Sequence, residues 1–246
     1  MTAAHDWIVP DWPAPAGVRA ASTTRTGGVS TGPYASLNLA GHVGDDPAAV
    51  AANRVRLRER LRLPAEPAWL EQVHGTGILD LDAGSSGPAD GAVTRRPGRV
   101  AVVMTADCLP LLLCTRTGDR VAALHAGWRG LAAGVIEAGL ERLDAPGEQV
   151  LAWLGPAIGP AAFAVGEEVR DAFTRHDPRA ATAFQARGGE LYADLYTLVR
   201  QRLEARGVTA VHGGGRCTWS EPEHFYSYRR DGATGRMASL IWLGGS

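Results

Sequence analysis

The sequence predicts an α/β protein, in which a mixed β-sheet is flanked by helices within a single compact domain, residues 1–246. Short apolar runs rich in branched residues and bounded by Gly, Asp and Pro are typical of buried strands. These runs alternate with longer stretches of helical periodicity. One pair of neighbouring apolar runs is joined by a turn short enough for a β-hairpin. The chain contains no repeat and no low-complexity linker, so one core is expected.

The first half of the chain is predicted to hold one helix among extended and irregular segments. Asp46 is a favourable N-cap and Pro47 a favourable first residue, so a helix is expected from there to about Leu61. Three arginines on one face of this helix indicate a solvated surface. Strands are expected at residues 7–21, 67–73 and 78–81, and residues 89–94 lead back into the central strands.

The second half is predicted to alternate between strands and amphipathic helices. Apolar residues recur every three or four positions in the helical stretches, which are residues 130–143, 166–176 and 194–206. Gly207 is a plausible C-terminal cap for the last of these. The apolar runs that predict strands are residues 100–104, 109–114, 121–124, 150–154, 208–211 and 237–243.

The central hairpin is expected to bring two reactive side chains to one face of the sheet. Residues 115–120 form the turn between its two strands, and Gly118 tolerates positive φ there. If the turn centres between residues 116 and 117, Cys108 pairs with His125. If it centres between residues 117 and 118, Cys108 faces Gly127 and lies diagonal to His125. Side chains alternate along a strand, so both registers leave Cys108 and His125 on one face, ~5 Å or ~7 Å apart.

Cys108 and His125 each lie where an apolar run meets Gly, Asp or Pro, which is where side chains emerge from a core. Taken singly, each is more simply a core residue, because Cys behaves as a small hydrophobe. Taken together they indicate a site, and His74, at a Gly-rich break between apolar runs, is the best third partner. Two His and one Cys with an open fourth position match a catalytic zinc site, and copper is the alternative metal.

Composition excludes several classes of function. A net charge of −1 gives no electrostatic case for binding nucleic acid or an anionic membrane. Asp6 and the lack of a basic-then-apolar segment predict no signal peptide, and no apolar run approaches the ~20 residues that span a bilayer. Three cysteines make no disulfide framework, and free thiols fit a reducing compartment, so a cytoplasmic protein is expected.

Lysine is absent, and all 25 basic residues are arginine. This excludes Schiff-base chemistry and a P-loop, because both need a lysine. Any charge that binds phosphate therefore comes from arginine, with help from backbone amides. The candidates are Arg25 in the glycine loop 23–30, Arg129 in GWRG, and the paired Arg229 and Arg230 beside aromatic residues.

Seven motifs follow one another along nearly the whole chain. Four of them are QVHGTGI from Gln72, ADGAVT from Ala89, TADCLPLLL from Thr105 and ALHAGWRG from Ala123. The others are RTGGVSTGPYASLNLAGHVGDDP from Arg25, LGPAIGP from Leu154 and FYSYRRDGATGRMASLIWL from Phe225. With these motifs the sequence resembles the YfiH family of purine nucleoside phosphorylases, also called the laccase-domain or polyphenol-oxidase family. One departure follows GPAIGP, where relatives often have cysteines and this chain has Ala161 and Ala162.

The resemblance implies a YfiH-like, cysteine-hydrolase-like mixed α/β fold. It also implies zinc-dependent phosphorolysis of adenosine, inosine and methylthioadenosine to base and sugar 1-phosphate, together with adenosine deamination. The expected partners are therefore purine nucleosides and phosphate. The implied metal ligands and catalytic residues are His74, Cys108 and His125.

The remaining site residues are candidates for proton transfer and substrate binding. Asp107 is the candidate for moving protons, and its alternative role is to cap the turn. The candidates for binding substrate and phosphate are Arg25, Asn38, Arg129, Arg229 and Arg230.

Three other functions remain open. A Cys108–His125 hydrolase or amidase would act through a thiolate, on a peptidoglycan-like amide. A copper-dependent polyphenol oxidase is disfavoured, because a multicopper laccase needs about ten histidines in His-x-His pairs. The chain has seven histidines and no such pair. A non-catalytic metal-binding or partner-binding module would hold metal and turn over no nucleoside.

Overall fold

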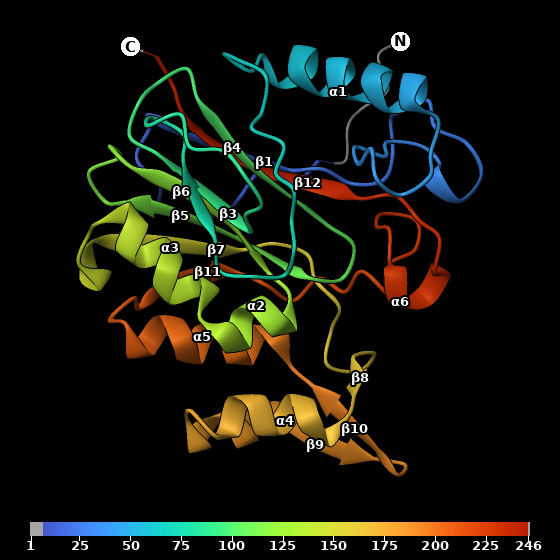
Figure 1. Cartoon of the computed structure of the whole chain (residues 1–246), viewed down its shortest axis with the longest axis vertical. Helices are drawn as coiled ribbons and strands as arrows, with labels where there is room; N and C mark the ends of the chain where they lie inside the picture. The colour runs from blue at the N-terminus through green and yellow to red at the C-terminus, as the bar shows by residue number, and fades with distance from the viewer. Residues whose placement is uncertain (1–6, 246) are drawn as a thin grey trace.

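Two β-sheets stacked face to face form the centre of the molecule, with helices on both outer sides (Figure 1). The structure is a computed structural model and describes residues 7–245. The α/β class and the single compact domain predicted from the sequence are confirmed. The predicted strands are divided between two sheets, however, because stacking two sheets lets each bury both of its faces.

The larger sheet has six strands in the order β11-β7-β5-β6-β3-β2. It is mixed, because β2–β3 and β7–β11 are parallel and the other pairs are antiparallel. Its strands are β2 (Ile78–Asp80), β3 (Gly91–Thr94), β5 (Leu109–Thr115), β6 (Val121–Ala126), β7 (Val150–Leu154) and β11 (Ala210–Gly213).

The second sheet is antiparallel and has the order β1-β12-β4. Its strands are β1 (Val18–Ser22), β4 (Val100–Thr105) and β12 (Met237–Leu243). The chain passes from this sheet to the larger one between the end of β4 and the start of β5. Asp107 and Cys108 therefore lie at a corner between two sheets, and Asp107 turns this corner with φ +95°.

Alternate side chains of β5 enter different cores, which explains its unbroken apolar sequence. Leu112 and Cys114 lie between the two sheets, where they join residues of all three strands β1, β4 and β12. Leu111 and Leu113 point to the other side, against the helices. A third cluster, which includes Leu57, fills the space between the smaller sheet and α1.

The described part of the chain contains six α-helices. They are α1 (Pro47–Leu61), α2 (Trp128–Ala133), α3 (Val135–Leu143), α4 (Glu167–Thr174), α5 (Leu195–Ala205) and α6 (Tyr228–Asp231). α1 begins as predicted, with the Asp46 carboxylate accepting a hydrogen bond from the Ala48 amide at 2.9 Å. The single helix predicted over residues 130–143 is wrong. Gly134, at φ +105°, ends α2 and starts α3, because this left-handed conformation interrupts a helix.

Three other predictions of extended structure need correction. Residues 67–73 form no strand, and only Ala68 bridges to Ala101. The predicted strand 7–21 is reduced to β1, since its prolines lack the N–H that a ladder needs. The strand predicted at residues 208–211 begins only at Ala210.

A small third sheet was not predicted from the sequence. Its strands are β8 (Ala164–Val165), β9 (Phe184–Arg187) and β10 (Glu190–Ala193). It lies beside α4 at the end of the molecule away from α1 (Figure 1). Within the described residues, no helix is long and apolar enough to cross a membrane. Asp6, on which the leader prediction rests, lies outside that range.

Candidate functional site

The hairpin of β5 and β6 adopts the second of the two predicted registers. Pro110 pairs with His125, so Cys108 faces Gly127 and lies diagonal to His125. Gly127 is required at this position. A Cβ there would lie 2.9 Å from the Cys108 Sγ and 2.9 Å from the Cδ2 of His74.

His74, Cys108 and His125 converge, as predicted, although they come from three separate segments. One ligand atom from each lies within 4.8 Å of the others, and the Cys108 Sγ is 3.9 Å from the His74 Nε2. The two imidazole rings meet edge to face at 4.8 Å between centroids. In a tetrahedral zinc site the sulfur–nitrogen edge is about 3.6 Å, given the usual bond lengths. The group therefore fits a metal after only a small contraction.

Asp90 holds both histidines in place. It is completely buried, and its Oδ1 accepts a hydrogen bond from the His125 Nδ1 at 2.7 Å. The same carboxylate accepts the backbone amides of Val73, His74 and Gly75 at 2.6–3.2 Å. Nδ1 of His125 is thus occupied, which leaves Nε2 as its ligand atom. A carboxylate behind a histidine fixes the ring orientation and increases its basicity as a ligand.

His74 adopts a left-handed backbone conformation, with φ +59°. Such a conformation is unfavourable for a residue with a Cβ, and it persists only where the surroundings enforce it. The three amides bound by Asp90 provide that enforcement, because they fix the chain on both sides of His74.

The ionisation of the cluster favours a thiolate. Burial opposes ionisation of Cys108, but the positive charge of His125 and hydrogen bonds from His125 and His74 outweigh it and lower the thiol pKa to about 6. Burial also opposes protonation of His125, yet the Cys108 charge and the hydrogen bond to Asp90 raise its pKa to about 9. A thiolate is the form of cysteine that binds metals and acts as a nucleophile.

The cluster faces a pocket of about 500 Å³. Three cationic or potentially cationic side chains, His42, Arg129 and Arg236, line it together with the ligands. No Asp or Glu of the described chain is among its lining residues. Tyr228 also lines this pocket, and 61% of its surface is exposed. Gln72, another lining residue, forms two hydrogen bonds with the backbone of Met104.

Asp107 lies next to Cys108 but is turned toward the protein. Its Oδ1 accepts the Thr218 hydroxyl at 2.6 Å, and its Oδ2 accepts the Arg229 amide at 2.6 Å. This carboxylate therefore ties the corner between the sheets to α6, and a role in proton transfer would require one of these bonds to open.

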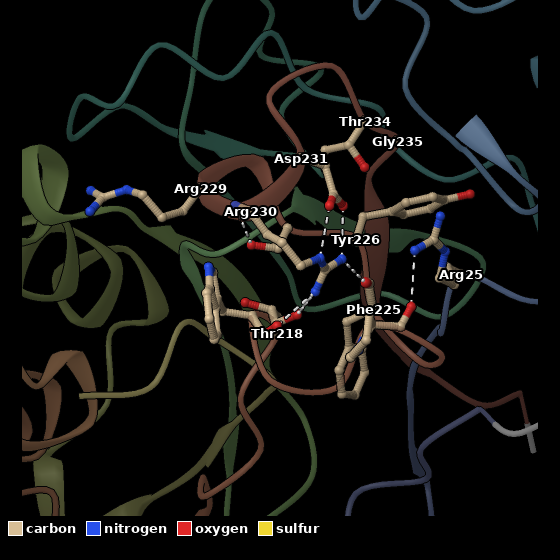
Figure 2. Close-up of polar contacts among 12 residues, drawn as sticks. Arg25, Thr218, Phe225, Tyr226, Arg229, Arg230, Asp231, Thr234 and Gly235 are labelled. Carbon is tan, nitrogen blue, oxygen red and sulfur yellow. Dashed lines mark hydrogen bonds and ion pairs between the residues drawn. The ribbon is translucent and has the colours of Figure 1, made fainter. Parts of the chain in front are cut away.

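Three of the arginines expected to bind substrate are engaged elsewhere, and Figure 2 shows the polar contacts of Arg25 and Arg230. Arg25 donates to the carbonyls of Ala35 and Pro222 and lies over the ring of Tyr226 at 4.8 Å. Arg230 pairs with Asp231 at 2.8 Å and donates to three backbone carbonyls.

Arg229 donates to the Ala164 carbonyl at 2.6 Å and lines a neighbouring pocket. Asn38 is completely buried and bonds to the Asp45 carboxylate and the Arg236 amide. Of the five residues predicted to bind substrate, Arg129 alone lines the pocket of the His74–Cys108–His125 cluster, at the border with the neighbouring pocket.

Four residues of the site were not identified from the sequence, namely Asp90, Arg236, His42 and Tyr228. All four lie within the sequence motifs by which the chain resembles the YfiH family. An acidic residue at the end of a Gly/Ser loop and directly before a short apolar run, as in Ala89-Asp90-Gly91, was the available signal for Asp90.

Comparison with known proteins identifies the family. The family model described as "Multi-copper polyphenol oxidoreductase laccase" matches residues 19–244. The chain belongs to the YfiH, or laccase-domain, family. As a YfiH-family member it is 58% identical to a purine nucleoside phosphorylase of Pseudomonas aeruginosa, over 96% of this chain and 98% of the relative. It is 56% identical to the purine nucleoside phosphorylase YfiH of Escherichia coli, with the same coverage of both chains, 96% and 98%.

Solved structures of the YfiH family have the same fold. A protein of Neisseria meningitidis superposes with a TM-score of 0.93 at 50% identity, covering 98% of this chain and 100% of its own. YlmD of Geobacillus stearothermophilus gives 0.89 at 33% identity, covering 100% and 98%. The family and fold predicted from the sequence motifs are thereby confirmed.

We expect Asp90→Asn to weaken metal binding by about 10- to 100-fold, because substitutions of residues that orient metal ligands have effects of this size. The asparagine keeps the size of the side chain but lacks the charge that supports His125. Competition with a chromogenic chelator measures the change. Asp171→Asn, on the exposed surface of α4, is the matched control, and equal affinities in the two variants would refute the role of Asp90.

Proposed function

We propose that this chain is a metal-dependent purine nucleoside phosphorylase acting on adenosine, inosine and methylthioadenosine, with adenosine deamination at the same centre. The observation that carries the proposal is the convergence of His74, Cys108 and His125 on a pocket whose described lining residues include arginines and no carboxylate. Such a pocket suits a metal and an anionic co-substrate together. Relatives 56–58% identical to the chain are named purine nucleoside phosphorylases.

Zinc is the metal that we propose. Two imidazoles, one thiolate and an open fourth position fit a catalytic zinc site. When bound, zinc supplies Lewis acidity and lowers the pKa of a water ligand to about 7. Copper is the alternative, because the same three donors also occur in copper sites and the family model is described as multi-copper.

The side chains around the cluster supply binding and orientation. Tyr228 presents an exposed ring at the pocket, and aromatic rings stack on nucleobases. Arg129 offers a guanidinium, whose paired N–H groups match phosphate oxygens. His125, held by Asp90, keeps the Cys108 thiolate in its charged form. We also propose that Asp107 contributes to catalysis, by holding the Cys108 corner against α6.

A substrate panel tests the proposal. Adenosine, inosine and methylthioadenosine are each incubated with the protein, with and without phosphate, and the products are separated by chromatography. We expect free base and sugar 1-phosphate from each nucleoside only when phosphate is present. Base release that is independent of phosphate would identify a hydrolase instead, and no release from any of the three would reject the proposed activity.

A cysteine hydrolase is a second candidate, because Cys108, His125 and Asp90 are arranged as nucleophile, base and orienting carboxylate. Metal content separates the two functions. A stoichiometric metal that protects Cys108 from iodoacetamide until a chelator is added supports the phosphorylase. A metal-free, readily alkylated thiolate supports the hydrolase.

A multicopper oxidase is less well supported. His74, Cys108 and His125 form the one cluster of three or more potential metal ligands within residues 7–245, whereas such an oxidase needs several copper centres.

The three cysteines are free, which fits a reducing compartment, and we propose the cytoplasm as the location of the protein.

A further inference from the structure

Arg236 is held rigidly at the wall of the pocket. It directly precedes β12, and its amide donates to the Asn38 side chain at 2.9 Å. The buried Asn38 is itself bonded to the Asp45 carboxylate. The backbone that carries this arginine is therefore fixed before any ligand binds, and its side chain lines the same pocket as the metal-binding cluster.

The guanidinium of Arg236 is only partly satisfied by the protein. Its Nη1 donates to the carbonyls of Thr234 and Gly235 at 2.9 and 3.0 Å. An arginine has five N–H donors, and within residues 7–245 its Nε and Nη2 have no hydrogen-bond partner in the protein. Across residues 7–245, no carboxylate forms an ion pair with it, although burial makes its charge costly and lowers its pKa. Cys108 and Asp107 attract this charge and favour it, but neither is hydrogen-bonded to the guanidinium in the described chain, so the guanidinium can take a further anionic ligand.

Neighbouring side chains make the same part of the pocket a site for an anion. His42 and Arg129 line it with Arg236, and the ring of Tyr228 lies 5.7 Å from the Arg236 guanidinium carbon. The guanidinium groups of Arg129 and Arg236, together with a metal at the cluster, would outweigh the negative charge of the Cys108 thiolate, and an excess of positive charge in a cavity concentrates anions. Burial and the positive charges of Arg236 and Arg54 lower the pKa of His42, and a bound anion would favour its protonated form.

We propose that Arg236, assisted by His42 and Arg129, binds the phosphate co-substrate next to the metal-binding cluster. The proposal rests on the proposed phosphorylase function for the identity of the anion, and on the pocket alone for its position. Guanidinium groups bind phosphate through two parallel hydrogen bonds, which the free Nε and Nη2 of Arg236 supply. Arg25 and Arg230 are unsuited to this role, because neither is among the residues that line this pocket.

Calorimetric titration of the metal-loaded protein with inorganic phosphate, without nucleoside, tests the site independently of turnover. Arg236→Gln is expected to bind phosphate at least ~10-fold more weakly, since a hydrogen bond to a charged group contributes enough for this change. Arg236→Lys should be intermediate, because lysine keeps the charge but loses the paired donors. Arg175→Gln, at the exposed end of α4, is the matched control and should bind like the unmodified protein.

Kinetics and chemical labelling complete the test. In Arg236→Gln, the KM for phosphate should rise by ~10-fold or more, while the KM for nucleoside changes little. If that variant misfolds, phenylglyoxal labelling of the unmodified protein replaces it, and phosphate should protect Arg236 much more than Arg175. Unchanged phosphate affinity in a folded Arg236→Gln, or equal protection of both arginines, would overturn the proposal. Phosphate binding through Arg236 without any phosphorolysis would support the site and reject the phosphorylase.

Discussion

The Cys108→Ala variant is expected to remain folded but to lose its metal, and its kcat/KM should fall by at least about 1,000-fold. Cys108 supplies the only sulfur of the cluster and, by its charge, helps to raise the pKa of His125. It lies at the corner between β4 and β5 and belongs to none of the apolar clusters of the described chain. Its truncation therefore removes a ligand without opening a large cavity in the core.

Plasma mass spectrometry of the purified variant measures the metal, and thermal unfolding reports the fold. Cys217→Ser is the matched control, because Cys217 is also a free, half-buried thiol but lies outside the metal-binding cluster. We expect this control to keep stoichiometric metal and full activity. A folded Cys108→Ala that still holds one metal per chain would mean that the ligand set is assigned incorrectly.

Removal of the metal is expected to abolish adenosine deamination, whereas removal of phosphate is expected to stop base release and leave inosine formation intact. Deamination consumes water and phosphorolysis consumes phosphate, so the two reactions depend on different nucleophiles. Within residues 7–245 a single cluster can hold the metal, and loss of its ion should therefore leave no other centre to activate water.

The measurement uses adenosine in four buffers, with and without chelator and with and without phosphate. Inosine, adenine and hypoxanthine are then separated and quantified. Restoring activity with zinc, and with copper in a parallel sample, controls for damage by the chelator and identifies the metal. Undiminished inosine formation by metal-free protein would reject a metal-dependent deaminase, and full adenine release without phosphate would indicate hydrolysis.

Much of this architecture was predictable because it depends on local sequence. The apolar runs and the turn at Gly118 predicted the β5–β6 hairpin, and alternation along its strands placed Cys108 and His125 on one face in either register. The Asp46-Pro47 start of α1 was equally local. His74 was found by its position at a break between apolar runs, and the structure brings it to the other two ligands.

Local pattern failed where backbone conformation or long-range pairing decided the outcome. Gly134 sits within an uninterrupted helical periodicity, yet its left-handed conformation divides α2 from α3. Most strands of the two large sheets were identified, but their division into two stacked sheets depends on the turn of the chain at Asp107, which periodicity does not encode.

The sequence by itself determined the fold class, the hairpin and the three residues that can hold a metal. Only the tertiary structure decided which charged groups serve that centre. Asp90 reaches His125 across 35 positions, and Arg25 and Arg230 are drawn to backbone carbonyls while Arg236 faces the pocket. The physical reason is that strand and helix patterns arise from neighbours along the chain. The partner of a buried charge is set instead by whichever donors and acceptors folding brings within hydrogen-bonding distance.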